Sequence, residues 1–270
     1  MKTSQGWPIG ICNWSLRMDI NSVIKVMNDL DVEHVHLSVG PAMEEGGELY
    51  LRVAKEHQWT ITATMIDFPQ EDYSTLESIR NTGGIMPDSE WPKNRERFIE
   101  AAEITKDLGS SYITMHAGFL EHDDPVLLNK FFQRINFLAD EAKKKDLTLL
   151  LETGQETGEE MRRFMEEINH PYLGINFDPA NIILYDKGDP IDALKVLAPY
   201  VKHVHIKDAM YTDATGTWGA EVPWGEGQVG HHRFLDALSE IEYSGALAVE
   251  REAGEDRVGD VKWAVENLSQ

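Results

Sequence analysis

Eight short apolar segments alternate along this chain with stretches in which apolar residues recur at helical spacing. Such runs predict buried strands, and they cover residues 9–13, 32–37, 60–66, 112–116, 147–152, 173–177, 201–207 and 246–250. Ile20, Val23, Ile24 and Met27 follow the i, i+3, i+4, i+7 pattern of an amphipathic helix. Similar spacing recurs over residues 95–108, 131–142, 159–168, 191–198, 234–241 and 261–268. The chain is therefore predicted to form eight strand–helix units that end on a helix.

This alternation restricts the fold class to α/β proteins. Strands that are separated by helices pair in parallel, and the helices cover the sheet. Eight such units in 270 residues predict a (β/α)8 TIM barrel that forms a single domain over residues 1–270. An open, doubly wound sheet is disfavoured because no nucleotide-binding fingerprint follows the first predicted strand.

Two predicted connections are much longer than the usual two to six residues of a βα loop. They run over residues 67–92 and 208–230, and both follow the carboxyl end of a strand. Active sites of such barrels lie on this face. We therefore expect the two loops to act as lids over a site.

Four polar residues lie at or near the carboxyl ends of the last four predicted strands. They are Glu152, Asp178, His205 and Glu250. In a barrel, corresponding strand ends meet at one rim, so these side chains are expected to lie together. Carboxylate oxygens and an imidazole suit Mn²⁺, Mg²⁺, Co²⁺ or Zn²⁺. The sequence thus predicts one divalent metal ion at this rim.

Several longer motifs resemble those of a known family. The runs LLLETG, NFDPAN, HVHIKD and PWGEGQVG, followed by YSGALAVERE, and ERFIEAAEITKDLGSSYITMHAG are similar to xylose-isomerase-like TIM barrels. These include sugar phosphate isomerases and epimerases, and they are related to ketose 3-epimerases and endonuclease IV. The resemblance implies that Glu152, Asp178, His205 and Glu250 hold the metal. It also implies an isomerase or epimerase of a keto-sugar or derivative, with Glu152 and Glu250 as catalytic acid and base around a metal-stabilised enediolate.

The chain departs from this family pattern where the substrate would bind. Asn181 stands where the ketose epimerases usually carry a substrate-binding histidine. The arginine expected shortly after His205 is missing, and Tyr211 lies near that place. Because a carboxamide cannot reproduce the chemistry of an imidazolium, we expect a different substrate.

Residues around the predicted strand ends are candidates for binding that substrate: His116, Asn181, Lys207, Arg251, Trp14 and Trp224. Lys207 and Arg251 would bind a carboxylate or phosphate, or else form ion pairs within the protein. His116 would bind a hydroxyl or relay a proton, or else be a buried structural histidine. Trp14 and Trp224, with Trp218, would wall a sugar ring, or else be packing anchors.

Charge and composition exclude several other classes. The chain has 25 Lys and Arg against 47 Asp and Glu, a formal charge of −22, which opposes binding to nucleic acid or anionic lipid. Residues 1–8 lack the apolar stretch of a signal peptide, and no window approaches the ~20 apolar residues that span a bilayer. With Cys12 as the one cysteine, no intramolecular disulfide forms. We expect a soluble, cytoplasmic protein, and the resemblance leaves homo-oligomerisation open.

Other activities share parts of this pattern. A lyase of the same fold, such as an inosose dehydratase or a 3-keto-glycoside eliminase, begins with the same proton abstraction. Endonuclease IV-like DNA cleavage is opposed by the charge and by missing ligands, because Met65, Ile66 and Asp67 bring no histidine after the third strand. A barrel that binds a sugar without turnover is disfavoured by the four candidate metal ligands.

Overall fold

The computed structural model describes residues 2–214 and 216–269, and eight of its strands form one closed parallel barrel. Closure is complete because β2 pairs with β3 on one side and with β11 on the other. This confirms the predicted (β/α)8 barrel. The barrel strands are β2 (Trp7–Cys12), β3 (His34–Ser38), β4 (Thr60–Met65), β5 (Tyr112–Met115), β6 (Thr148–Glu152), β7 (Leu173–Phe177), β8 (Val201–Ile206) and β11 (Leu247–Val249).

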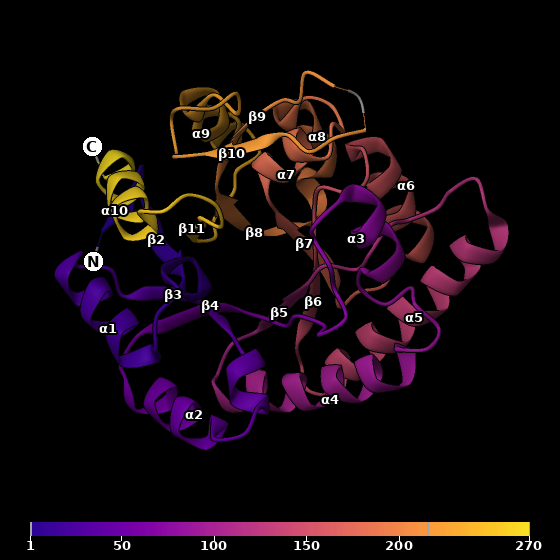
Figure 1. Ribbon diagram of the computed structural model, residues 1–270, viewed down its shortest axis with the longest axis horizontal. Helices are drawn as coiled ribbons and strands as arrows, with labels where there is room; N and C mark the ends of the chain where they lie inside the picture. Colours follow the sequence, from indigo (N-terminus) through magenta and orange to yellow (C-terminus); the bar gives the residue numbers. More distant parts are fainter. Residues whose placement is uncertain (1, 215, 270) are drawn as a thin grey trace.

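Helices surround the barrel on the outside, as Figure 1 shows for α1, α2, α4, α5 and α6. The first and last helices, α1 and α10, lie on the same side of the molecule (Figure 1). The α-helices are α1 (Ile20–Asp29), α2 (Gly47–Glu56), α3 (Leu76–Thr82), α4 (Trp91–Asp107), α5 (Pro125–Lys143), α6 (Gly158–Ile168), α7 (Pro179–Leu184), α8 (Pro190–Leu197), α9 (His231–Glu240) and α10 (Arg257–Leu268). None of the helices in the described part of the chain combines the length and apolarity needed to span a membrane.

Short elements complete the structure. The 3₁₀ helices are η1 (Asn13–Leu16), η2 (Gly40–Met43) and η3 (Ala198–Tyr200), and β1 (Thr3–Ser4) pairs antiparallel with β2. The helix α2 lies between the second and third barrel strands, where the sequence pattern named none. Gly47 and Ala54 are buried and Tyr50 and Leu51 pack against the core, so α2 has the i, i+3, i+4, i+7 spacing of an amphipathic helix, and the sequence analysis missed it.

Several predicted strand ends lie one residue beyond the observed strands. His116, Lys207 and Glu250 follow β5, β8 and β11 instead of ending them. Directly after the ladder ends, the N–H of Glu250 still donates to the carbonyl of Ile206 at 3.0 Å. These side chains therefore lie above the last rung of the barrel.

Both long connections contain regular structure that the sequence reading treated as loop. The first holds α3, and the second holds an antiparallel hairpin of β9 (Asp208–Met210) and β10 (Ala220–Val222). Backbone N–H groups of Gly225, Gly227 and Val229 donate to the buried Asp208 carboxylate at 3.0–3.1 Å. A Cβ at Gly227 would lie 2.1 Å from Asp208 Oδ1, so this close approach requires glycine.

The barrel interior is polar near its mouth. His36 Nε2 lies 2.9 Å from Thr114 Oγ1, and His203 Nδ1 lies 2.8 Å from Asn176 Oδ1. Thr62 Oγ1 lies 2.9 Å from the other nitrogen of His203. The main apolar core lies between the strands and the helices. This polar interior supports the side chains at the mouth from below.

Candidate metal centre

The four predicted metal ligands converge at the mouth of the barrel. The Nδ1 atom of His205 lies 3.5 Å from Glu152 Oε1, 3.5 Å from Asp178 Oδ2 and 3.4 Å from Glu250 Oε2. One ligand atom from each residue lies within 4.8 Å of all the others, and all four residues are buried. Ligands that share one ion at about 2.0–2.2 Å lie roughly 3–3.5 Å apart, so this spacing fits a single divalent ion.

Two atoms that face this cluster are buried and lack a hydrogen-bond partner within the described part of the chain: Asp178 Oδ2 and His205 Nδ1. The other carboxylate oxygen of Asp178 accepts from the N–H groups of Ala180 and Asn181 at 2.8 and 3.0 Å and so caps α7. Unpartnered buried polar atoms are costly. A cation between these ligands would satisfy both, so the donor set fits a divalent metal.

A second histidine, His36, supports His205 from inside the barrel. His36 Nδ1 lies 2.9 Å from His205 Nε2, and Thr114 Oγ1, on the far side of His36, donates to the carbonyl of Thr64 at 3.0 Å. When His205 Nδ1 is a ligand, its Nε2–H donates to His36, which fixes the ring orientation. The sequence analysis missed His36, although EHVHL at 33–37 repeats the pattern of KHVHI at 202–206.

Lys207 is buried against the metal ligands. Its ammonium donates to Glu250 Oε2 at 2.8 Å and to Glu252 Oε2 at 2.6 Å, and it lies 3.6 Å from Asp178 Oδ2. Burial lowers the pKa of Lys207, but these carboxylates outweigh it and raise the pKa well above its usual value. Lys207, with His205, holds the pKa of Glu250 at about 2 against the effect of burial. Lys207 thus forms ion pairs within the protein, which is one of the two alternatives that the sequence left open, and it still lines the cavity described below.

Glu152 is held by amides and faces a histidine. Asn176 and Asn181 each donate an amide N–H to one of its oxygens, at 3.1 and 3.0 Å. His116 Nε2 lies 3.6 Å from Glu152 Oε1, and the ring packs edge-on against Tyr73. Burial lowers the pKa of His116, but Glu152 and other carboxylates outweigh it and raise the pKa. Asn181 therefore positions a candidate catalytic carboxylate.

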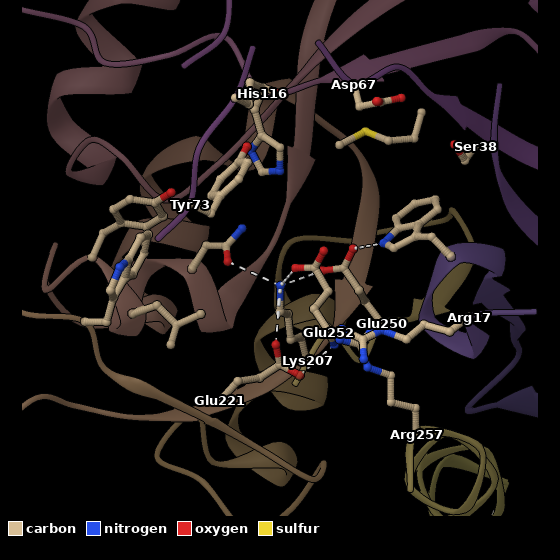
Figure 2. A pocket seen from close by; sticks show the side chains of 17 residues that line it. Arg17, Ser38, Asp67, Tyr73, His116, Lys207, Glu221, Glu250, Glu252 and Arg257 are labelled. Carbon is tan, nitrogen blue, oxygen red and sulfur yellow. Dashed lines mark hydrogen bonds and ion pairs between the residues drawn. The ribbon is translucent and has the colours of Figure 1, made fainter. Parts of the chain in front are cut away.

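A cavity of about 560 Å³ opens above this cluster (Figure 2). Of the predicted substrate contacts, Trp14, His116, Asn181 and Lys207 line it. Trp14 Nε1 also donates to Glu250 Oε1 at 2.8 Å. The long loops supply further lining residues that the sequence analysis did not single out: Glu71, Tyr73 and Glu221.

Two predicted contacts lie outside the cavity lining. Arg251 forms ion pairs with Glu221 at 2.6 Å and Asp260 at 2.8 Å, so its charge is used within the protein. Trp224 is 5% exposed and packs against Phe234, whereas Trp218 lines the cavity. Neither role could be assigned from sequence, since both depend on the course of the second long loop.

The closed barrel and the ligand cluster at its carboxyl face define a TIM-barrel protein with a candidate metal centre. Residues 24–270 match the sequence model of the family described as "Xylose isomerase-like TIM barrel". The chain belongs to this family, as its motifs predicted. The family and its neighbours consist mostly of sugar-modifying enzymes.

Individual relatives differ in their sequence identity to this chain and in the fraction of it that they cover. A solved xylose isomerase domain protein from Planctomyces limnophilus is 31% identical, covers 97% of this chain and 96% of its own, and superposes with a TM-score of 0.88. Inosose dehydratase 1 of Bacillus cereus is 24% identical over 188 residues, 58% of this chain and 62% of that relative's length. A solved L-ribulose 3-epimerase, at 18% identity, 96% and 95% coverage and a TM-score of 0.69, shares the fold.

Proposed function

We propose that this protein is a divalent-metal-dependent isomerase or epimerase of a keto-sugar or sugar derivative. The observation that carries the proposal is the pair of unpartnered atoms, Asp178 Oδ2 and His205 Nδ1, facing Glu152 and Glu250 below a cavity of about 560 Å³. Mn²⁺, Mg²⁺, Co²⁺ and Zn²⁺ suit this set of ligands, and two structural neighbours were solved with magnesium and with zinc. When bound, the ion polarises the carbonyl and the adjacent hydroxyl of the substrate.

The two glutamates are arranged for proton transfer next to that carbonyl. Lys207 keeps Glu250 ionised, so Glu250 is the base that takes the proton from carbon, and the C–H electron pair moves toward the carbonyl oxygen to give an enediolate. On the other side, His116 faces Glu152 and supplies a proton through it to the opposite face of the carbon. The amides of Asn176 and Asn181 keep Glu152 in place.

A dehydratase is the second candidate, and the position of His116 favours it. The ring lines the cavity and faces Glu152, and this and other carboxylates raise the pKa of His116 against the effect of burial. After the same first step, a proton from His116 to a β-hydroxyl would release water. The curated relative named inosose dehydratase adds support, although the chain matches less than two thirds of that relative's length.

Proton NMR in D₂O tests the proposal and separates the two reactions. Keto-sugars and 3-keto-glycosides are incubated with the protein and Mg²⁺ or Co²⁺. We expect deuterium at one carbon next to the carbonyl, together with an isomer or epimer of the substrate; an enone product would instead identify the dehydratase. Metal-free protein should show no exchange.

Glu250→Gln tests the base directly. Loss of one general base lowers the rate by about 10²–10⁴-fold, so exchange should fall by that amount while the fold is kept. Glu255→Gln, an exposed change of the same kind nearby, is the matched control. Near-wild-type exchange in Glu250→Gln would refute the assignment.

A further inference from the structure

Two arginines in the cavity wall have no carboxylate partner among the described residues. Arg17 caps the carboxyl end of η1, and Arg257 is the first residue of α10. Both line the cavity, and Figure 2 shows their side chains reaching the same region beside Glu252 from these two elements. The neighbouring Arg251 differs, because Glu221 and Asp260 neutralise it.

The unpaired state of this arginine pair is unexpected in so acidic a chain. With 47 acidic against 25 basic residues, carboxylates are abundant. The Nε atom of Arg257 is nevertheless buried and has no hydrogen-bond partner. A buried donor without a partner destabilises a protein, and two adjacent guanidiniums repel one another. In agreement, burial and the charge of Arg17 lower the pKa of Arg257, and Glu252 and Glu221 offset this only in part.

Glu252, which acts on Arg257 through its charge but forms no ion pair with it among the described residues, is already engaged. Glu252 receives a hydrogen bond from Lys207 at 2.6 Å. Lys207 and Arg251, which the sequence suggested as anion ligands, both use their charges on protein carboxylates. The free positive charge at this side of the cavity therefore belongs to Arg17 and Arg257.

We propose that Arg17 and Arg257 bind an anionic group of the substrate, a carboxylate or a phosphate, while its keto group lies at the metal cluster. Guanidinium groups match the planar, two-oxygen geometry of such anions. The substrate is then a keto-sugar acid or a keto-sugar phosphate and not a neutral ketose. This inference rests on the proposed function and narrows its substrate class.

Equilibrium binding by calorimetry tests the pair without any turnover. The probes are D-fructose, D-fructose 6-phosphate and 5-keto-D-gluconate, titrated into Mg²⁺-loaded protein. We expect at least one of the two anionic probes to bind about tenfold or more tightly than D-fructose, the usual effect of a hydrogen bond to a charged group. Which anion is preferred distinguishes phosphate from carboxylate.

Variants assign that preference to the two arginines. Arg17→Gln with Arg257→Gln should abolish it and leave the affinity for D-fructose unchanged. Arg52→Gln, an exposed arginine on α2 outside the cavity, is the matched control. Single Arg→Lys changes at positions 17 and 257 keep the charge and should retain part of the preference for the anion. If the double variant does not fold, these single variants test the inference in its place.

Two results would overturn the inference: no preference for an anion in the wild type, or a preference that persists in the folded arginine variants. Because binding is measured without reaction, these outcomes are independent of the exchange experiment. Deuterium exchange on neutral ketoses without an anion preference would leave the proposed function standing and refute only this substrate class. An anion preference without exchange on any keto-sugar would refute the proposed function, and Arg17 and Arg257 would then remain an anion-binding site.

Discussion

The hydrogen bonds and ion pairs of individual side-chain atoms determine which residues at the barrel mouth are free to bind a ligand. Asp178 uses one oxygen to cap α7 and leaves the other free for a metal. Lys207 resembles a substrate ligand in the sequence, but its ammonium is surrounded by Glu250, Glu252 and Asp178. Whether a residue can bind a metal or a substrate depends on which of its donors and acceptors remain unpaired. The residue type alone does not reveal this.

Glu156 provides a prediction about pH at the residue scale. Burial raises the pKa of this carboxyl to about 7, and it accepts a hydrogen bond from the N–H of Leu120 at 3.1 Å. The folded state therefore binds more protons than the unfolded state between about pH 4.5 and 7, and stability falls as the pH rises through this window. Above it, ionised Glu156 costs on the order of 3 kcal/mol.

We therefore expect Glu156→Gln to raise the unfolding temperature at pH 8, by several degrees given about 2–4 °C per kcal/mol, and much less at pH 5. Thermal unfolding at both pH values measures this difference. The exposed Glu255→Gln is the control. An equal effect at both pH values would show that Glu156 does not titrate in this range.

At the scale of elements, each long connection is organised by one carboxylate that accepts hydrogen bonds from backbone N–H groups. Asp208 accepts from four backbone N–H groups, including that of Ala209 at 2.9 Å, and so ties the second connection to the end of β8. In the first connection, Glu71 accepts from the N–H groups of Phe68 and Gly84 at 3.1 and 2.9 Å. Each carboxylate holds a segment that lines the cavity.

Asp208→Ala should therefore loosen the segment of residues 208–230 and leave the barrel folded. Losing several charge-assisted hydrogen bonds at one site costs about 2–4 kcal/mol. Hydrogen exchange should become faster at Gly225, Gly227 and Val229 but not in β6 or β7. Asp213→Ala, an exposed change in the same segment, should have no such effect. Unchanged exchange in Asp208→Ala would contradict this role.

At the scale of the whole molecule, the proposed metal site would couple metal binding to folding. The three carboxylates and His205 are contributed by four different strands or strand ends, from residue 152 to residue 250. An unfolded chain cannot bring them together, so an ion that binds this cluster stabilises only the folded barrel. At a free concentration of about 100 times its Kd, such an ion adds about 2.7 kcal/mol.

Adding Mn²⁺ to metal-free protein should thus raise the unfolding temperature by about 5–10 °C. Asp178→Asn should abolish this shift, yet keep the metal-free unfolding temperature, because asparagine caps a helix as well as aspartate does. Differential scanning fluorimetry with and without EDTA measures both. Asp213→Asn is the control, and an undiminished shift in Asp178→Asn would exclude the ligand.

Comparison of particular elements shows where sequence reasoning succeeds. The strand β7 begins and ends as predicted, because a strand buried on both faces is a nearly continuous apolar run. Glu152, Asp178, His205 and Glu250 were grouped correctly in space because parallel strands bring their carboxyl ends to one rim. By contrast, α2 was missed although its inward-facing residues have helical spacing, whereas α3 and the β9–β10 hairpin lie in segments without a regular apolar pattern.

The sequence by itself determined the barrel and the place of the ligand cluster, since both follow from local periodicity and from strand order. Only the tertiary structure decided the partners of Lys207 and Arg251, the support of His205 by His36, and the unpaired state of Arg17 and Arg257. These depend on contacts between side chains far apart in the chain, and their directions are set by packing and not by any local pattern.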